Sequence, residues 1–398
     1  MNIKRFIIPI IAIFLASLNL RPVITSVSPL LGTIRQSLNM SATSASLLTS
    51  LPVLCMGFFA PVAVKLANRW SIERAIAYSL ILIGVATAAR YYAFSSWVML
   101  ITAFLTGIGI AIIGPLLSGF IKQKFPNPSR IVGIYSLALV VGAALGSGFS
   151  IPLRTLFNNS WQTSVASWSI LALVAIFFWW KPVRNEPKLA HDESITDLSR
   201  SEKNGLKLVL TNKKAWILTS FFGVMAFMFY SITAWLPPIV EDMGYNKQAA
   251  AMMLTLLTLV QMPASLLIPI LISRFQNRVA WLIGCSVMEL IGLLTLLFSV
   301  TPWISSVFLG IGAGGLFSLG LILPIDEASN TKEASILAAM TQSVGYIFAA
   351  LGPIFVGSVR DYAGSFTPAI IGMIVVVVVM ILIQFKIGNK KASDDSSA

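Results

Sequence analysis

One arginine stands inside an apolar stretch near the start of the chain and is followed at once by a proline, Arg21-Pro22. If a helix begins near Phe6, Arg21 lies about 22 Å further along its axis. The hydrocarbon core of a bilayer is roughly 30 Å thick, so this guanidinium would lie inside it. A charge there costs about 2.5 kcal/mol or more unless it faces a partner or water. We expect Arg21 to bind a solute; the alternatives are that it snorkels outward or donates to a carbonyl freed by Pro22.

Polar side chains accompany Arg21 at helical spacing. Ser17, Thr25 and Ser28 would share one face of a regular helix with Arg21. A helix with one polar face suits the lining of a watery cavity better than a lipid-exposed anchor. We expect Thr25 and Ser28 to be neutral groups of the substrate site, although each alone is equally typical of packing.

The second half of the chain supplies further polar and aromatic groups within apolar stretches. The candidate substrate-binding residues there are Tyr230, Thr233, Gln261, Gln342 and Tyr346. Aromatic side chains could stack on a flat ring or close over a small anion. The glutamines are equally typical of hydrogen bonds between helices.

Other charged residues within apolar stretches are few. Glu289 is the one acidic residue well inside such a stretch, so it is the candidate for proton coupling, with structural pairing as the alternative. Arg90 and Arg154 lie near the predicted outer ends of their stretches, where we expect interfacial anchors.

The composition indicates a membrane protein. Of the 398 residues, 57% are hydrophobic and 11% are charged, whereas soluble domains carry about 25% charged residues. The two cysteines lie far apart in apolar stretches, and the single histidine lies in a polar one. The cysteines and the histidine are not spaced as metal ligands. The sequence also contains no catalytic pair and no phosphate-binding loop, so we expect neither an enzyme nor a metal or other cofactor.

Hydropathy predicts twelve membrane-spanning helices, each of about the length that a bilayer requires. They cover residues 6–33, 44–68, 74–93, 97–121, 130–155, 161–180, 214–240, 248–273, 279–299, 302–325, 333–358 and 364–387. The predicted fold is an all-α membrane protein with two pseudo-symmetric six-helix bundles. Its parts are an N-terminal half (1–180), a cytoplasmic linker (181–213) with a short amphipathic piece near 206–210, a C-terminal half (214–389) and a disordered tail (390–398).

The distribution of basic residues orients the chain. The net charge of +13 could suggest a nucleic-acid partner, but 22 of the 28 lysines and arginines fall at one predicted membrane face. This asymmetry is the positive-inside rule, which places both termini in the cytoplasm. We therefore expect the lipid bilayer, and no nucleic acid, as the partner that explains the charge.

An internal repeat supports the division into halves. A shift of 208 positions aligns Ile24 with Ile232, Thr25 with Thr233 and Pro29 with Pro237. Small residues also recur at a spacing of four in two spans: Ala138, Gly142, Gly146 and Ser150, then Gly345, Ala349, Pro353 and Gly357. Such spacing allows helices to approach closely, either in ordinary packing or at a moving interface. Parallel repeats of six helices are typical of transporters built from two halves.

Several motifs point to a known family. They are 18–22 (LNLRP), 46–54 (SLLTSLPVL), 120–126 (FIKQKFP), 340–346 (MTQSVGY) and 351–357 (LGPIFVG), the last followed by Arg360-Asp361. With twelve spans in two halves, the chain resembles the major facilitator superfamily, and the motifs resemble its cyanate and 2-nitroimidazole permease family (CynX/NimT type). Asn68 departs from the superfamily's pattern, because an aspartate is usual there, whereas Arg69 is kept.

Charged residues of opposite sign are expected at the cytoplasmic face of the two halves. The basic ones are Arg69, Arg74, Lys122, Lys124 and Arg130, and the acidic ones are Asp326, Glu327 and Glu333. They suggest a cytoplasmic gate that closes when the halves meet. Exposed ion pairs contribute only about 0–1 kcal/mol each, so such a gate biases the conformational equilibrium without fixing it.

The resemblance implies a secondary active or facilitative transporter in the bacterial inner membrane. We expect it to move a small solute, a cyanate-like anion or a 2-nitroimidazole-like planar compound, by alternating access and as a monomer. One alternative is a proton-coupled multidrug efflux transporter, which would have broad substrates and depend on Glu289. Another is a membrane receptor or scaffold that does not transport, which would give no solute flux in liposomes.

Overall fold

The computed structural model describes residues 3–125, 128–184, 212–275, 277–328 and 331–388. Within these residues, twelve helical spans are long and apolar enough to cross a membrane, as predicted. The amphipathic piece near 206–210, most of the linker and the tail lie outside the described residues. The sixth span continues to Arg184, four residues into the predicted linker.

The helices of the first half follow the predicted order. They are α1 (Ile3–Asn19), α2 (Pro22–Thr25), the short turn η1 (Ser28–Leu30), α3 (Leu31–Leu38), α4 (Ala42–Trp70), α5 (Ile72–Ala89), the turn η2 (Arg90–Tyr92), α6 (Ser96–Lys124), α7 (Pro128–Leu156), α8 (Trp161–Ser167) and α9 (Ser169–Arg184). The first span is thus made of four pieces, and the sixth span is made of α8 and α9.

The second half has the same plan. Its helices are α11 (Lys213–Asp242), α12 (Lys247–Phe275), α13 (Arg278–Leu297), α14 (Pro302–Glu327), α15 (Thr331–Ala349), α16 (Leu351–Ala363) and α17 (Thr367–Ile387). The eleventh span is interrupted at Ala350, between α15 and α16.

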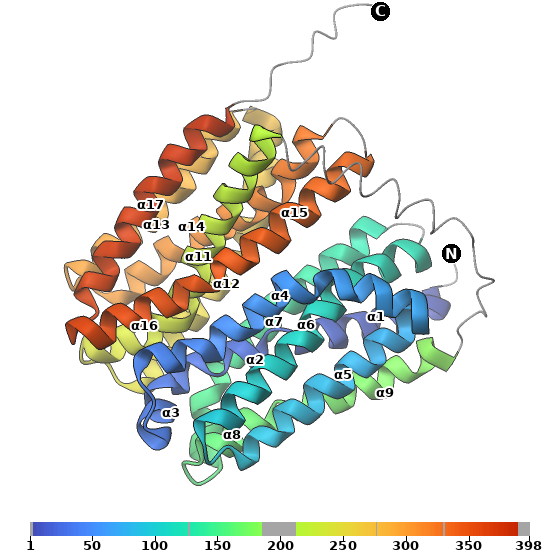
Figure 1. Ribbon diagram of the computed structural model, residues 1–398, viewed down its shortest axis with the longest axis horizontal. Helices are drawn as coiled ribbons and strands as arrows, with labels where there is room; N and C mark the ends of the chain where they lie inside the picture. Colours follow the sequence, from blue (N-terminus) through green and yellow to red (C-terminus); the bar gives the residue numbers. More distant parts are fainter. Residues whose placement is uncertain (1–2, 126–127, 185–211, 276, 329–330, 389–398) are drawn as a thin grey trace, which may run out of the picture.

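The two halves repeat the same helix pairings. In the first half α1 packs against α7 and α9, α4 against α6, and α5 against α6 and α9. In the second half α11 packs against α15 and α17, α12 against α14, and α13 against α14 and α17. Figure 1 shows the two bundles as separate bodies that meet along one side. The predicted fold of two pseudo-symmetric six-helix bundles is therefore confirmed.

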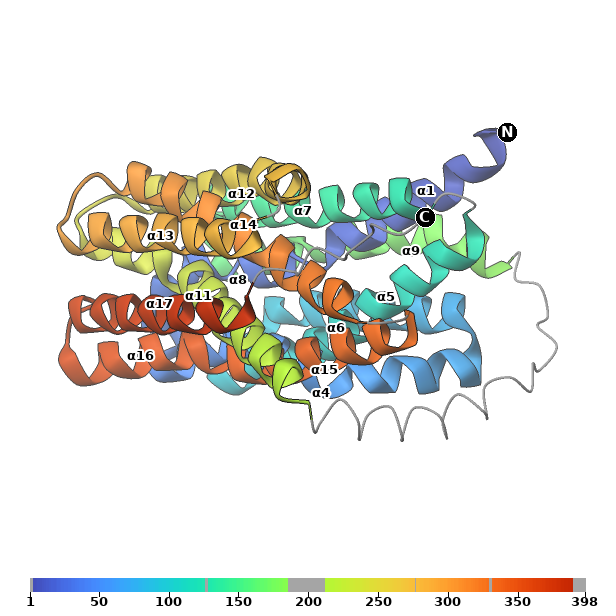
Figure 2. The ribbon, with the colours of Figure 1, turned by 90° about the horizontal axis from the view of Figure 1, so that it is seen from above.

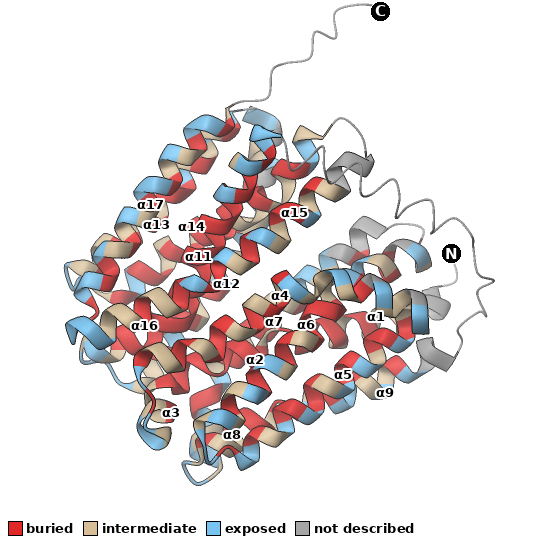
Figure 3. Ribbon diagram, viewed as in Figure 1, coloured by how far each residue is buried: buried red, intermediate tan, exposed pale blue. Residues whose placement is uncertain are grey.

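Contacts between the halves run through two symmetric pairs of spans. Helix α4 packs against α15 and α16, and α7 packs against α12 (Figure 2). Helix α11 crosses between them and is the most thoroughly buried span. Buried positions face the helix interfaces and exposed ones face outward (Figure 3). The exposed side chains include Val85, Phe177 and Leu382, which suits a surface that contacts lipid.

Each half is tied together at the face where α1 begins and α17 ends, which we call the terminal side. In the first half, Lys124 at the end of α6 pairs with Glu73 at the start of α5, at 3.5 Å. In the second half, Glu327 at the end of α14 pairs with Arg278 at the start of α13. The two ion pairs occupy matching places with the charges reversed, so each bundle is braced as a unit.

Candidate functional site between the two halves

The first span is interrupted at Arg21. Helix α1 ends at Asn19 and α2 begins at Pro22, whose nitrogen carries no hydrogen and cannot continue the helix. The Arg21 carbonyl accepts hydrogen bonds from the amides of Ile24 and Thr25, each at 3.0 Å. The polar face expected through Ser17, Arg21, Thr25 and Ser28 is therefore not carried by one continuous helix, because Ser17 lies in α1, Thr25 in α2 and Ser28 in η1.

The interruption presents the half-buried Arg21 to the second half. Its guanidinium carbon lies 5.8 Å from the centre of the Phe229 ring on α11, within the range of a cation–π contact. The guanidinium also interacts with three tyrosine hydroxyls, those of Tyr135 on α7, Tyr230 on α11 and Tyr346 on α15. The Tyr230 hydroxyl itself donates to the Met56 Sδ atom of α4 at 3.8 Å. Arg21 is thus the polar centre of a site built by both halves.

The second half contributes an aromatic wall, made of Phe222, Phe229, Tyr230, Phe317 and Tyr346. The ring centres of Phe229 and Tyr230 are 5.1 Å apart, those of Phe222 and Tyr346 are 5.4 Å apart, and both pairs are edge-to-face. Phe317 on α14 lies 6.1 Å from Phe229. Such packing holds ring faces and edges in fixed directions, which is what recognition of a flat solute requires.

The charge of Arg21 is not balanced by an acidic side chain. Among the described residues, no carboxylate pairs with this guanidinium. Arginine offers several N–H donors in a planar fork that matches carboxylate-like oxygens. A guanidinium beside aromatic rings and hydroxyl groups can therefore hold a small anion or a polarised planar group.

Three of the predicted substrate-binding residues come together here, namely Arg21, Tyr230 and Tyr346. Gln342 lies one helical turn from Tyr346 on α15, is half-buried, and makes no hydrogen bond to another described residue. The residues that the sequence reasoning missed are Tyr135 and the three phenylalanines of the aromatic wall, Phe222, Phe229 and Phe317. Phe229 could have been found, because the shift of 208 positions that aligns Thr25 with Thr233 also aligns Arg21 with Phe229.

The remaining predicted binding residues do not join the Arg21 cluster. The hydroxyls of Thr25 and Thr233 donate to the carbonyls of Arg21 and Phe229 on their own helices, at 3.1 and 2.7 Å. Ser28 is fully buried in η1, which packs against α7 and α11. Gln261 is half-buried on α12, where its backbone carbonyl faces Gly314 of α14.

Glu289 lies inside the second half. It is 1% exposed, and its side chain packs against Gly312 of α14. Neither carboxyl oxygen has a hydrogen-bond partner within the described residues. Helix α13 packs against α14 and α17, so Glu289 belongs to the interior of one bundle.

The ion pairs that the described gate residues Lys124 and Glu327 form stay within their own halves in this conformation. Lys124 pairs with Glu73, and Glu327 pairs with Arg278 and Lys214, each within its own half. Arg69 and Asp326 are exposed, and Arg74 lies in the first turn of α5. The side chains of Lys122, Arg130 and Glu333 lie outside the described part of the chain.

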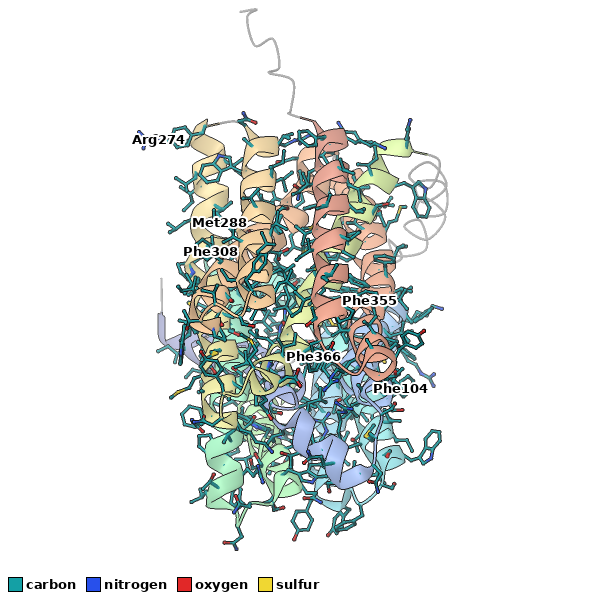
Figure 4. The ribbon with its side chains drawn as sticks, turned by 90° about the vertical axis from the view of Figure 1, so that its left-hand side faces the viewer. Phe104, Arg274, Met288, Phe308, Phe355 and Phe366 are labelled. Atoms are coloured by element: carbon teal, nitrogen blue, oxygen red, sulfur yellow. The ribbon has the colours of Figure 1, made fainter. Side chains whose placement is uncertain are left out.

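The contacts that join the halves gather on the distal side, which is the face of the turn between α3 and α4. The carboxylate of Asp361 accepts hydrogen bonds from the amides of Ala42 and Thr43, each at 2.7 Å. Lys247 donates to the Thr33 hydroxyl at 2.8 Å. Figure 4 shows that Phe366, which packs beside Arg360 there, lies at the end of the second half opposite Arg274. The structure is therefore closed on the distal side.

The regularly spaced small residues divide between the two expected roles. A side chain at Gly142 or Gly146 would collide with the interrupted first span, at Leu18 and at Thr25 respectively. Gly357, by contrast, lies against Ala42 and Ser46 of the other half. Packing within the first half thus explains Gly142 and Gly146, whereas Gly357 belongs to the interface between the halves.

The expected role of Arg90 as an interfacial anchor is wrong. Arg90 is fully buried, and its Nη1 atom donates to the Val23 carbonyl of α2 at 2.8 Å. Arg154 donates to the Asn159 carbonyl at 3.2 Å in an exposed position.

Comparisons with known proteins agree with this architecture. A family model described as Major Facilitator Superfamily matches residues 10–353. The chain is 33% identical to the cyanate transport protein CynX of Escherichia coli (strain K12), over 90% of this chain and 91% of that protein. It is 30% identical to the 2-nitroimidazole transporter of the same strain, over 98% of this chain and 97% of that protein. Among solved structures, the nucleoside transporter NupG superimposes with a TM-score of 0.77 at 13% identity, over 95% of this chain and 99% of that one.

Proposed function

The chain belongs to the major facilitator superfamily of membrane transporters, and on this premise we propose that it carries a small planar or linear anion, or a planar polar ring, at Arg21. The observation that carries the proposal is the position of this guanidinium. No described carboxylate pairs with the guanidinium. Its carbon lies 5.8 Å from the centre of the Phe229 ring, which belongs to the aromatic wall of the other half. Binding an anion there would neutralise a charge that is costly at membrane depth.

The names of two relatives support this substrate class. Cyanate is a linear anion with a delocalised charge, and 2-nitroimidazole is a flat ring whose nitro oxygens are negatively polarised. Both present oxygen atoms to a guanidinium fork and a π-system to aromatic rings. The relatives are similar over almost the full length of this chain. We therefore propose cyanate-like anions and 2-nitroimidazole-like compounds as substrates.

Alternating access is the proposed mechanism. The basic residues favour a cytoplasmic location for the terminal side in a bacterial inner membrane. The distal contacts of Asp361 and Lys247 then make the present conformation the one that is closed to the outside. Transport requires these contacts to break and the terminal ends of the halves to approach each other. The expected cytoplasmic gate, from Arg69 to Arg130 and from Asp326 to Glu333, would form at that stage.

The membrane potential constrains the direction of anion movement. With a negative interior, each elementary charge moved across 100 mV is worth about 2.3 kcal/mol. A monoanion moved alone is therefore driven outward, and its uptake requires a coupled cation or a steep concentration gradient. A neutral planar compound is indifferent to the potential.

Proton-coupled multidrug efflux is the second candidate function, and Glu289 is the observation that favours it. Its carboxyl group is buried and has no hydrogen-bond partner among the described residues, and an acidic side chain inside a membrane span is a candidate proton carrier. Glu289→Gln should abolish transport driven by a pH gradient if this candidate is right. Under the first proposal, the same variant transports cyanate as the unmodified protein does.

The decisive experiment reconstitutes the purified protein in liposomes and sets voltage and pH gradients independently. We expect saturable uptake of cyanate that responds to voltage, and uptake of 2-nitroimidazole that does not. Broad transport of unrelated hydrophobic compounds, dependent on the pH gradient, would favour efflux. Absence of any flux with well-folded protein would favour a receptor or scaffold and overturn the proposal.

A further inference from the structure

The first half contains a second arginine at membrane depth, and it does not reach the aromatic wall. Arg90 begins the turn η2 at the end of α5, and its side chain is completely buried. Its Nη1 atom donates a 2.8 Å hydrogen bond to the backbone carbonyl of Val23. Its Nε atom has no acceptor among the described residues.

The carbonyl that Arg90 binds is one that the interrupted helix leaves without a backbone partner. In a regular helix the Val27 amide would donate to Val23, but here it donates to Ile24 at 3.2 Å. The neighbouring residues pair locally, because the Ser26 amide donates to Pro22 at 2.9 Å. A buried carbonyl without a donor is unfavourable. Arg90 therefore satisfies the group that the interruption exposes.

The position of this hydrogen bond relates it to the proposed substrate site. Val23 lies in α2, two residues after Arg21, which directly precedes this short helix. In the same stretch of the first span, Gly142 and Gly146 of α7 lie directly against Leu18 and Pro22. The stretch is thus held between the Arg90 side chain and the backbone of α7.

An ordinary packing role does not account for a charge at position 90. A glutamine amide is also a planar donor, with a smaller desolvation penalty than a guanidinium, but its nitrogen stands about two bonds nearer the backbone than Nη1, so from position 90 it would fall short of the Val23 carbonyl. The guanidinium combines this reach with several N–H donors in one planar head. Such a group suits a carbonyl whose orientation must be controlled.

We propose that Arg90 is a positioning residue for Arg21: its hydrogen bond to Val23 fixes the interrupted first span so that the Arg21 guanidinium points at Phe229 and Tyr230. The proposal rests on the proposed role of Arg21 in binding, and it adds a residue that does not itself touch the solute. It implies that a change at position 90 acts on substrate affinity only through Arg21.

The first test reads the exposure of Arg21 without any transport. Purified protein in detergent is treated with phenylglyoxal, which modifies accessible arginines, and modification of Arg21 is followed by mass spectrometry. We expect severalfold faster modification of Arg21 in Arg90→Gln than in the unmodified protein. The matched control is Arg154→Gln, which removes another arginine–carbonyl hydrogen bond of the same half and should leave the Arg21 rate unchanged. Equal Arg21 rates in all three proteins would overturn the proposal.

The second test is a double-mutant cycle with cyanate uptake into liposomes, using Arg90→Gln, Arg21→Gln and the double variant. We expect Arg90→Gln to lower kcat/KM about tenfold, chiefly by raising KM. It should add no loss in the Arg21→Gln background, because it acts through Arg21. Losses that multiply in the double variant would overturn the proposal.

Two further measurements keep the outcome interpretable. If Arg90→Gln does not yield folded protein, Arg90→Lys retains the charge with a single donor group, and its Arg21 should be modified faster than that of the unmodified protein. A rate equal to that of the unmodified protein would count against the proposal. If the unmodified protein transports neither cyanate nor 2-nitroimidazole, the proposed function fails, and the phenylglyoxal rates alone decide the role of Arg90.

Discussion

The guanidinium carbon of Arg21 lies 5.8 Å from the ring centre of Phe229, and the two residues occupy the same position in the two halves. Their numbers differ by 208, as do those of Thr25 and Thr233, whose hydroxyls donate to the Arg21 and Phe229 carbonyls. Equivalent points of the repeat therefore meet at the centre of the molecule. One carries a permanent charge and the other an aromatic ring, so the site is asymmetric although the scaffold is not.

Replacing Arg21 by lysine should selectively impair the transport of anions. Lysine keeps the charge but loses the planar, delocalised head, whose several N–H donors stand in a fixed geometry. We expect Arg21→Lys to lower kcat/KM for cyanate by about tenfold, which corresponds to roughly 1.4 kcal/mol of lost binding. Tracer uptake into liposomes measures the effect. Unimpaired cyanate flux in this variant would argue against recognition through the fork.

Weakening the distal contacts should favour the conformation that is open on the distal side. Asp361→Asn removes the negative charge from the first turn of α4, where Ala42 and Thr43 donate to it. We expect a loss of about 1 kcal/mol, or about fivefold in the population of the closed state. The readout is the labelling rate of a cysteine introduced at the buried Ser50, in a background without Cys55 and Cys285, by a maleimide added to the distal side.

The control for this experiment is Asp242→Asn. Asp242 lies on the same side, and its ion pair with Arg360 at 3.2 Å stays within the second half. The control should leave the labelling rate of the introduced cysteine unchanged. If both variants accelerate labelling equally, a general loss of surface charge is the cause, and the specific role of Asp361 is refuted.

Removing the Glu327 carboxylate should destabilise the second half. In Glu327→Gln the Arg278 side chain, which is 7% exposed, loses its charged partner, and breaking such a pair typically costs about 3 kcal/mol. The neighbouring Asp326→Asn changes an exposed residue and should alter stability by no more than about 0.5 kcal/mol. Thermal unfolding of both proteins in detergent measures the difference. Equal unfolding temperatures would show that the ion pair does not brace the bundle.

The proposed cytoplasmic gate is best tested at Asp326, because Glu327 also braces its own half. Asp326→Lys places a positive charge opposite the basic residues of the first half, which disfavours approach of the terminal ends. We expect the population to shift toward the inward-open state, and a cysteine placed at Arg69 should react faster with a maleimide on the terminal side. An unchanged rate would remove the gate from the mechanism.

A methyl group at Gly142 should disturb the interrupted first span. The added carbon of Gly142→Ala would collide with the Leu18 carbonyl and lie 3.2 Å from Pro22, so the backbone that carries Arg21 must shift. We expect destabilisation by about 1–3 kcal/mol and loss of cyanate transport. Gly133→Ala on the same helix, with nothing within 4 Å, should be neutral or slightly stabilising. Normal transport by Gly142→Ala would contradict this account of the close contact.

The membrane architecture could be predicted from the sequence because hydropathy and the length of a spanning helix are local properties. Twelve apolar stretches, a polar segment between the sixth and seventh, and a repeat offset of 208 are all readable along the chain. The importance of Arg21 could also be predicted, since a charge inside an apolar stretch is unfavourable without a specific partner.

Only the tertiary structure decided which side chains meet Arg21. A helical periodicity assigned Thr25 and Ser28 to its face, but the Thr25 hydroxyl donates to the Arg21 carbonyl and Ser28 is fully buried in η1. Tyr135 and Tyr346 approach Arg21 because α7 and α15 pack beside the first and seventh spans, and Asp361 reaches α4 because the distal ends of the halves touch. Such contacts depend on the relative placement of distant segments, which a linear pattern does not encode residue by residue. Local composition therefore determined that a buried charge needs a partner, and the packing of the two halves determined what surrounds it.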